Sequence, residues 1–257
     1  MLVALALEVA ASAEDSQGLP FAVWQVEEGL EQIPITAVLQ TRDGYLWLGT
    51  YTGLVRFDGV RQTVFAPANT PKLRNSRITS LYEDPAGVLC IGHESGEVTF
   101  YQSGEFRPQG PVGKWPGGAV ESMGTDEAGD LWLLSGSGAL VRLRDGHVLG
   151  PLGDSSASRK VALARERNGK LWLAGNGKVA SVARGELVPF GFDDPGGTNF
   201  YERVVPAQDG GLWVMTSTAL RKLPSAVKSK NRITKITPRP MSRIVRLALC
   251  CASNCPP

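Results

Sequence analysis

A segment of about 41 residues occurs five times along this chain, and this repeat constrains the fold more than any other feature of the sequence. Each copy contains a glycine followed by an apolar run: GYLWLGT from Gly44, GVLCIGH from Gly87, GDLWLLS from Gly129, GKLWLAG from Gly169 and GGLWVMT from Gly210. The position of Trp47 is held later by Cys90, Trp132, Trp172 and Trp213, at intervals of 43, 42, 40 and 41 residues. A period near 40 residues with several short strands per copy predicts an all-β fold, a β-propeller in which each copy forms one four-stranded blade.

Turn-forming dipeptides divide each copy into strands. Asp43-Gly44 precedes the apolar run of the first copy, and Asp58-Gly59 ends the run that follows it. The second turn recurs as Ser103-Gly104, Asp145-Gly146 and Arg184-Gly185. Such pairs favour tight hairpins because their residues tolerate positive φ. For the first blade we predict strands at Thr36–Gln40, Tyr45–Thr50, Leu54–Phe57 and Gln62–Ala66.

The later blades follow the same pattern as far as Pro224. Blade two is predicted at Ile78–Tyr82, Leu89–Gly92, Val98–Tyr101 and near Phe106, and blades three and four begin near Ala119 and Val161. Blade five begins near Arg203, includes Leu212–Thr216 and Ala219–Leu223, and stops after three strands. The segment FAVWQV (Phe21–Val26) is our candidate for the missing fourth strand, because its pairing with Ala219–Leu223 would close the ring and remove an exposed sheet edge.

The first repeats resemble the two-component regulator propeller family. The family repeat has an Asp-Gly turn, a Leu-Trp pair and a Gly-Thr pair, then Gly-Leu with a basic and an aromatic residue, and Gln40 to Gly59 match this pattern closely. The later copies depart from it: Cys90 replaces the tryptophan, and Leu134, Ala174 and Met215 replace the glycine. The resemblance implies a sensor propeller, usually with seven blades per ring. The five copies are therefore either a closed five-bladed ring or a fragment of a seven-bladed one.

The ends of the chain differ from the repeats. Residues 1–13 hold an apolar run and the triplet Ala11-Ser12-Ala13, which favour a signal-peptide-like remnant, with a disordered or misassigned N-terminus as the alternative. Residues 14–224 are the predicted propeller. Residues 225–257 hold seven basic residues, no acidic one and no repeat pattern, which favours a truncated or frame-shifted gene over a basic tail or linker.

The charge distribution argues against a nucleic-acid partner. Residues 1–224 hold 20 basic and 25 acidic residues, a net charge of −5, whereas a nucleic-acid surface needs clustered lysine and arginine. The 30 glycines fit a turn-rich β protein. No segment is apolar over the length that spans a bilayer, so we expect membrane contact only through segments missing from this sequence.

The sequence shows no enzyme motif. It lacks nucleophile-elbow, HExxH, P-loop and paired-carboxylate patterns, and its only histidines, His93 and His147, are expected in separate loops. Four aspartates that precede glycine are interpreted as turn caps: Asp43, Asp58, Asp145 and Asp209. The tryptophan column is interpreted as packing between blades, and Cys90 as a small buried residue. Because the cysteines at 250, 251 and 255 lack a zinc-site spacing, we predict no metal and no cofactor.

Loops at one end of the blades form the mouth of a propeller channel, where ligands generally bind. These loops join the second and third strands of a blade, or link one blade to the next. The candidate ligand-binding residues in them are Tyr51, Arg77, His93, Trp115, Arg159, Asn176 and Tyr201. The aromatic members can stack on a pyranose face, and they would equally suit the rim of a protein interface.

Together with the resemblance, these features predict a periplasmic or otherwise extracytoplasmic propeller of a signalling regulator, without catalytic output in this chain. It would bind an unknown small molecule, with carbohydrate as the family-based expectation, or a protein partner. Two alternatives stay open: a lyase-type propeller enzyme that uses His93 and a divalent metal, and an interaction scaffold without a small-molecule pocket. An open ring would expose apolar faces on blades one and five, and we then expect self-association such as a homodimer.

Overall fold

The computed structural model describes residues 34–109, 115–144, 146–152, 162–175, 178–190, 201–216 and 220–224. All of them belong to one compact unit of the chain that begins at Ile33. Within these ranges the chain forms 19 β-strands in five antiparallel sheets, and each sheet is one blade. A search of the same ranges finds no helix that could cross a membrane.

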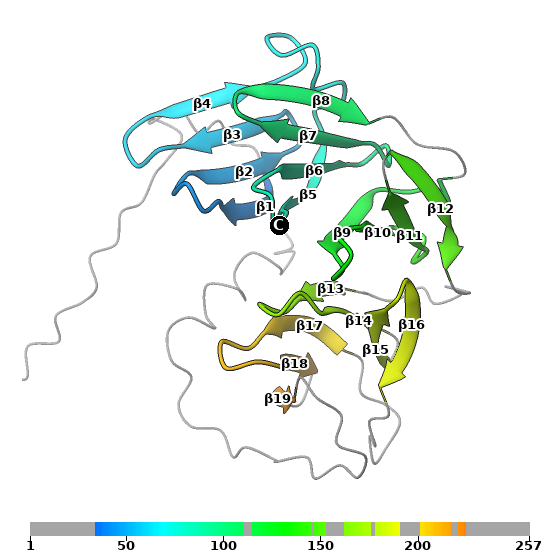
Figure 1. The fold of residues 1–257 in the computed structure, drawn as a ribbon. Helices are drawn as coiled ribbons and strands as arrows, with labels where there is room; N and C mark the ends of the chain where they lie inside the picture. Colours follow the sequence, from blue (N-terminus) through cyan, green and yellow to red (C-terminus); the bar gives the residue numbers. More distant parts are fainter. Residues whose placement is uncertain are drawn as a thin grey trace, which may run out of the picture. The chain divides into compact units, whose positions relative to one another are not determined.

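The strands of every blade pair in sequence order, and the sheets follow one another along the chain (Figure 1). Blade 1 consists of β1 (Ile35–Gln40), β2 (Leu46–Thr50), β3 (Leu54–Phe57) and β4 (Gln62–Phe65). Blade 2 consists of β5 (Ile78–Glu83), β6 (Leu89–His93), β7 (Val98–Gln102) and β8 (Glu105–Gln109). Blade 3 consists of β9 (Val120–Thr125), β10 (Leu131–Ser135), β11 (Leu140–Arg144) and β12 (His147–Leu152). Blade 4 consists of β13 (Ala162–Arg165), β14 (Leu171–Gly175), β15 (Lys178–Ala183) and β16 (Glu186–Phe190). Blade 5 consists of β17 (Tyr201–Pro206), β18 (Leu212–Thr216) and β19 (Leu220–Leu223).

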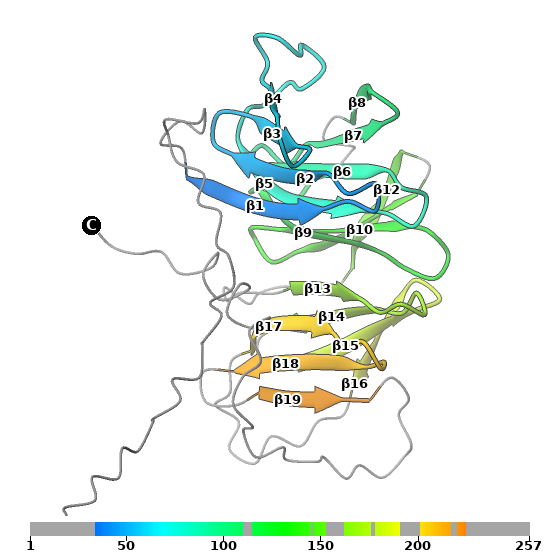
Figure 2. The same ribbon diagram turned by 90° about the vertical axis from the view of Figure 1, so that its left-hand side faces the viewer.

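The predicted fold class and repeat register are confirmed. The strands of blade 1 begin and end within one residue of their predicted bounds, and β9 and β13 begin one residue after the predicted blade starts. Blade 5 has three strands among the residues described, as expected, and Figure 2 shows them side by side. Phe21–Val26 lies outside the described residues, so closure of the ring stays a prediction, as do the boundaries at residues 13 and 224.

The outer turns adopt the backbone that their dipeptides predict. Ser103 and Gly104 both have positive φ, 50° and 86°, which is the geometry that joins two antiparallel strands most tightly. Asp58 caps its turn, since its Oδ1 accepts hydrogen bonds from the N–H groups of Val60 and Arg61. Asp209 instead forms an ion pair with Lys222. Asp43 also caps its turn, and Asp145 lies outside the described ranges.

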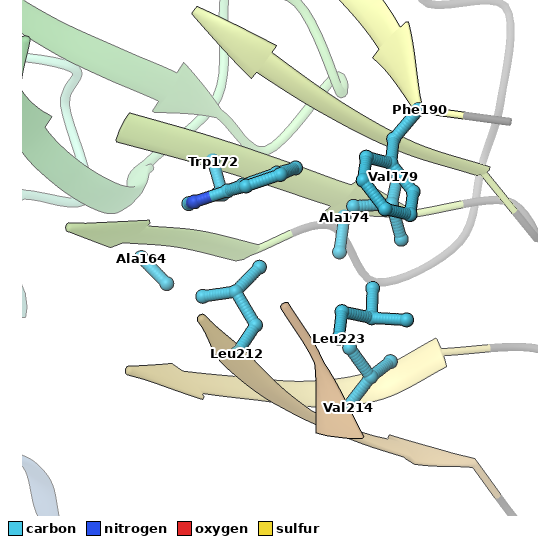
Figure 3. Packing of buried hydrophobic residues seen from close by; sticks show 8 residues of the cluster. All are labelled: Ala164, Trp172, Ala174, Val179, Phe190, Leu212, Val214 and Leu223. Atoms are coloured by element: carbon cyan, nitrogen blue, oxygen red, sulfur yellow. The ribbon is translucent and has the colours of Figure 1, made fainter. Parts of the chain in front are cut away.

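Apolar side chains fill the space between successive blades. The four residues Trp47, Cys90, Trp132 and Trp172 are each at most 2% exposed, which confirms that the column packs between blades. Figure 3 shows the contact between blades 4 and 5, where the Trp172 ring and Phe190 lie on one side and Leu212, Val214 and Leu223 on the other. Comparable clusters lie between blades 1 and 2, 2 and 3, and 3 and 4.

Each fully buried tryptophan donates its indole N–H to a residue six positions earlier in the chain. The three bonds are Trp47 Nε1 to Thr41 Oγ1 at 3.1 Å, Trp132 Nε1 to Asp126 Oδ2 at 2.8 Å, and Trp172 Nε1 to Glu166 Oε1 at 2.5 Å. Asp126 is 5% exposed, and its Oδ1 also accepts hydrogen bonds from the N–H groups of Ala128 and Asp130. This carboxylate therefore fixes both the turn and the ring, and no polar hydrogen at this point is buried without an acceptor.

We predict that Asp126→Ala lowers the free energy of unfolding by about 2–4 kcal/mol, because it leaves a buried indole N–H and two turn N–H groups without an acceptor. Urea unfolding followed by tryptophan fluorescence measures the loss. Asp209→Ala is the matched control, since this turn aspartate is exposed and pairs only with Lys222 among the described contacts. A loss from the control as large as that from Asp126→Ala would contradict the assigned role.

Candidate functional site

Three exposed side chains from blades 1 and 2 meet at the end of the blades where the second and third strands join. Tyr51 directly follows β2, Arg77 directly precedes β5, and Glu94 directly follows β6. Arg77 Nη1 lies 2.8 Å from Glu94 Oε2, and Arg77 Cζ lies 5.4 Å from the centre of the Tyr51 ring. The side chains of Arg77 and Glu94 are 55% and 49% exposed, and Tyr51 is 46% exposed. We call these residues the Tyr51–Arg77–Glu94 patch.

Backbone hydrogen bonds hold the patch in place. The N–H of Glu94 donates to the carbonyl oxygen of Arg77 at 3.0 Å, and the N–H of Arg77 donates to Asn75 Oδ1 at 2.9 Å. The segment that leads into blade 2 is thus tied to the β6–β7 turn. The hydrogen bond with Glu94 raises the pKa of Arg77 above its ordinary value, so the guanidinium remains charged.

His93 lies directly beneath the patch and is not the exposed loop residue that we expected. It is the last residue of β6, which runs one residue further than predicted, and it is 1% exposed. Its Nε2 lies 2.8 Å from Thr99 Oγ1. Burial lowers the pKa of His93 to about 4, so the ring is neutral near pH 7. The residue supports the turn from inside the blade.

Trp115 covers the same turn from the side of blade 3. Its Nε1 donates to the carbonyl oxygen of Gly118 at 2.9 Å, and its ring packs against the cluster between blades 2 and 3. A Cβ at Gly96 would lie 2.1 Å from Trp115 Nε1, so the indole occupies the space that the missing side chain leaves. The ring of Trp115 therefore packs against the β6–β7 turn.

The remaining candidates are less informative. Arg159 and Asn176 lie outside the described ranges, and Tyr201 begins β17 with only its backbone described. Glu94 was missing from the predicted set, although a signal for it exists. It occupies the same position in the second repeat as Tyr51 in the first, 43 residues earlier.

A second charged cluster joins β10 and β11. Asp130 is 5% exposed, and its oxygens accept hydrogen bonds from Arg142 Nε at 2.6 Å and Arg144 Nε at 2.7 Å. The hydrogen bond from Arg144, followed by that from Arg142, holds the pKa of Asp130 below its ordinary value. Both oxygens of this carboxylate accept hydrogen bonds from the two arginines, so we interpret the cluster as stabilising blade 3 and not as a ligand site. In the described part of the chain, no three His, Cys, Asp or Glu residues gather in a way that could hold a metal ion.

Comparison with known proteins supports the resemblance seen in the repeats. Residues 29–52 match the two component regulator propeller family. No curated protein sequence matches the chain. Virginiamycin B lyase from Staphylococcus aureus is similar in structure, with a TM-score of 0.62 and 15% identity over 80% of this chain and 71% of that one.

Two extracellular domains from B. thetaiotaomicron are also similar in structure. One belongs to a protein described as a one component system, with a TM-score of 0.56 and 16% identity over 78% of this chain. The other belongs to a protein described as a hybrid two component system, with a TM-score of 0.52 and 16% identity over 82% of this chain. This chain covers only 30% and 33% of those structures. At such identities the likeness shows a shared propeller fold.

The buried His93 predicts a pH dependence of stability. An unfolded histidine has a pKa near 6.5 and the folded one about 4, so between these values the unfolded chain binds the additional proton. Stability is therefore lost as the pH falls from about 6.5 to about 4, by about 3 kcal/mol in total. We expect His93→Gln to remove this part of the pH dependence in urea unfolding measured between those values.

His147→Gln is the control for this measurement, because His147 is exposed. It should leave the dependence of the wild type unchanged. The same pH dependence in His93→Gln and wild type would show that His93 titrates freely in the folded protein.

Proposed function

We propose that this propeller is the extracytoplasmic sensor portion of a signalling regulator, and that the Tyr51–Arg77–Glu94 patch contacts its ligand. The match of residues 29–52 to the two component regulator propeller family carries the proposal, because the matched segment includes β1, β2 and Tyr51. The similar structures described as extracellular domains of signalling proteins support the location. They share the fold with this chain, and the function is our inference.

The chemistry of the patch suits a polyhydroxylated ligand. The face of Tyr51 can stack on a pyranose ring, Arg77 offers several N–H donors, and the Glu94 carboxylate accepts hydrogen bonds from hydroxyl groups. The ion pair between Arg77 and Glu94 is exposed, so it contributes little to stability and can rearrange around a ligand. We therefore propose carbohydrate as the ligand class.

Because the patch spans two blades, a bound ligand can change how these blades are arranged. Tyr51 belongs to blade 1, Glu94 to blade 2, and Arg77 to the segment that links the two blades. A ligand that contacts all three residues favours one arrangement of the two blades over another. It can shift that equilibrium only by the difference between its affinities for the two arrangements.

The burial and low pKa of His93 argue against the alternative of a lyase-type enzyme that uses this histidine as its acid or base. A general acid or base must reach its substrate and needs a pKa near the working pH. His93 is 1% exposed with a pKa of about 4, and its Nε2 is engaged by Thr99. We propose that this chain binds its ligand without transforming it.

We predict that the purified chain binds members of an array of immobilised oligosaccharides, and that Tyr51→Ala and Arg77→Gln each weaken the binding at least about tenfold, which corresponds to about 1.4 kcal/mol. Isothermal titration calorimetry with the oligosaccharide that binds most strongly on the array measures the change. Arg61→Gln is the matched control, because Arg61 is an exposed arginine in the β3–β4 turn, at the other end of blade 1.

The other outcomes distinguish the alternatives. If no oligosaccharide binds, the carbohydrate assignment is wrong. Binding of a protein that is lost in Arg77→Gln would favour the interaction scaffold. If the oligosaccharide is consumed only when a divalent metal is added, the lyase-type enzyme is favoured. If Arg61→Gln weakens binding as much as Arg77→Gln does, the patch is not the binding surface.

A further inference from the structure

The inner strands of blades 2 and 3 pack on the preceding blade in the same way at their first residue. Ile78 and Val120 begin β5 and β9, and both are 0% exposed. Each packs on a glycine of the preceding blade: a Cβ at Gly49 would lie 2.7 Å from Ile78 Cγ2, and a Cβ at Gly92 would lie 2.9 Å from Val120 Cβ. Ile35 holds the same position at the start of β1 and is 46% exposed. Ile35 is therefore accessible at the position where Ile78 and Val120 are buried against a preceding blade.

A second position on β1 repeats this observation. Val38 on β1 pairs with Leu48 on β2. The inner-strand residues at the same position are Met123 in blade 3, which pairs with Leu133, and Leu163 in blade 4, which pairs with Leu173. Met123 is 6% exposed and Leu163 is 9% exposed, whereas Val38 is 46% exposed. Leu48 itself is 8% exposed, so the accessible part of this face is the inner strand. Inner strands also make most of the contacts between neighbouring blades in this chain.

The opposite situation holds at blade 5. The tryptophan column of the earlier blades is buried by the blade that follows, yet Trp213 is only partly buried, and Lys222 Nζ lies 5.6 Å from the centre of its ring. Val205 pairs with Trp213 and is 51% exposed. In blade 4 the residue that pairs with Trp172 is Ala164, which is 6% exposed.

The two accessible faces are complementary in kind. Within the chain, the face that carries the tryptophan column packs against the next blade, including residues of its inner strand such as Ile78 of β5 and Met123 of β9. In Figure 3 the face of blade 4 meets Leu212, Val214 and Leu223 of blade 5. Blade 5 offers a tryptophan face and blade 1 offers an inner strand. Both faces carry accessible apolar side chains at positions that are buried where successive blades meet.

We propose that Ile35 and Val38 of one copy of this chain dock against Val205 and Trp213 of a second copy. The contact reproduces between two chains the packing that joins successive blades within one. It is a head-to-tail interface, because the two surfaces differ, and it forms a closed ring of copies or an open chain depending on the angle between them. Burial of these side chains removes exposed apolar surface from water.

The experiment uses the full 257-residue chain and two substitutions that block opposite faces. Ile35→Glu places a charge on the inner strand of blade 1, and Val205→Glu places one on the tryptophan face of blade 5. Sedimentation velocity over a range of concentrations measures self-association. We expect the wild type to associate, and each variant alone to weaken association at least about tenfold, because a carboxylate would be buried without a partner.

Mixing the two variants is the decisive measurement. An equimolar mixture retains one intact pair of faces, blade 5 of Ile35→Glu with blade 1 of Val205→Glu, so it should form a dimer that grows no further. Val188→Glu is the control, since Val188 is 47% exposed on β16, the outer strand of blade 4, and this variant should associate like the wild type. Circular dichroism establishes that each variant is folded.

Three results would overturn the proposal. The wild type could remain monomeric at every concentration. Association could persist in Ile35→Glu or Val205→Glu, which would place the interface elsewhere. The mixture could fail to form the dimer although both variants are folded, which would exclude a head-to-tail contact through these faces.

Discussion

Burial of a large ring between neighbouring sheets, with its N–H satisfied from within its own blade, is the interaction on which the rest of this structure depends. A buried tryptophan contributes a large apolar surface, but an indole N–H without an acceptor would offset part of that gain. Asp126 and Glu166 supply the acceptor from the turn that precedes the ring. Packing and hydrogen bonding therefore reinforce each other at one point of the repeat, and Cys90 preserves the packing where the ring is absent.

The candidate site is a consequence of this stacking. Tyr51 and Glu94 hold the same position in successive repeats, so their separation is set by how blade 2 packs on blade 1. Arg77 bridges them because the segment that links the blades ends directly before β5. Beneath them, the neutral His93 and the ring of Trp115 fill the space around the β6–β7 turn. The exposed residues of the patch thus rest on a buried support, which limits how the patch can move.

The repeat made the fold predictable, whereas the site was predictable only in part. Period, turn dipeptides and strand alternation are local signals, so strand bounds followed from them to within about one residue in blade 1. The burial of His93 was missed because it depends on β6 running one residue further, and every side chain of this strand is buried. Glu94 and the acceptor role of Asp126 were missed for a similar reason. The partner of Glu94 is Arg77, which belongs to the segment that links blades 1 and 2. For Asp126, nothing in the residue itself distinguishes a turn cap from an acceptor for a ring six residues later.

The proposed ligand patch and the proposed docking face meet in the same blade, and this has a physical consequence. Ile35 pairs with Thr50 across β1 and β2, at a register shift, and Thr50 is followed directly by Tyr51. A second copy that packs on Ile35 therefore acts on the strand pair that carries Tyr51. If both proposals hold, a ligand that favours one position of this strand pair alters the affinity for the second copy, and association alters the affinity for the ligand by the same factor. A sensor built in this way would need no catalytic group of its own, because occupancy of the patch would be reported as a change in assembly.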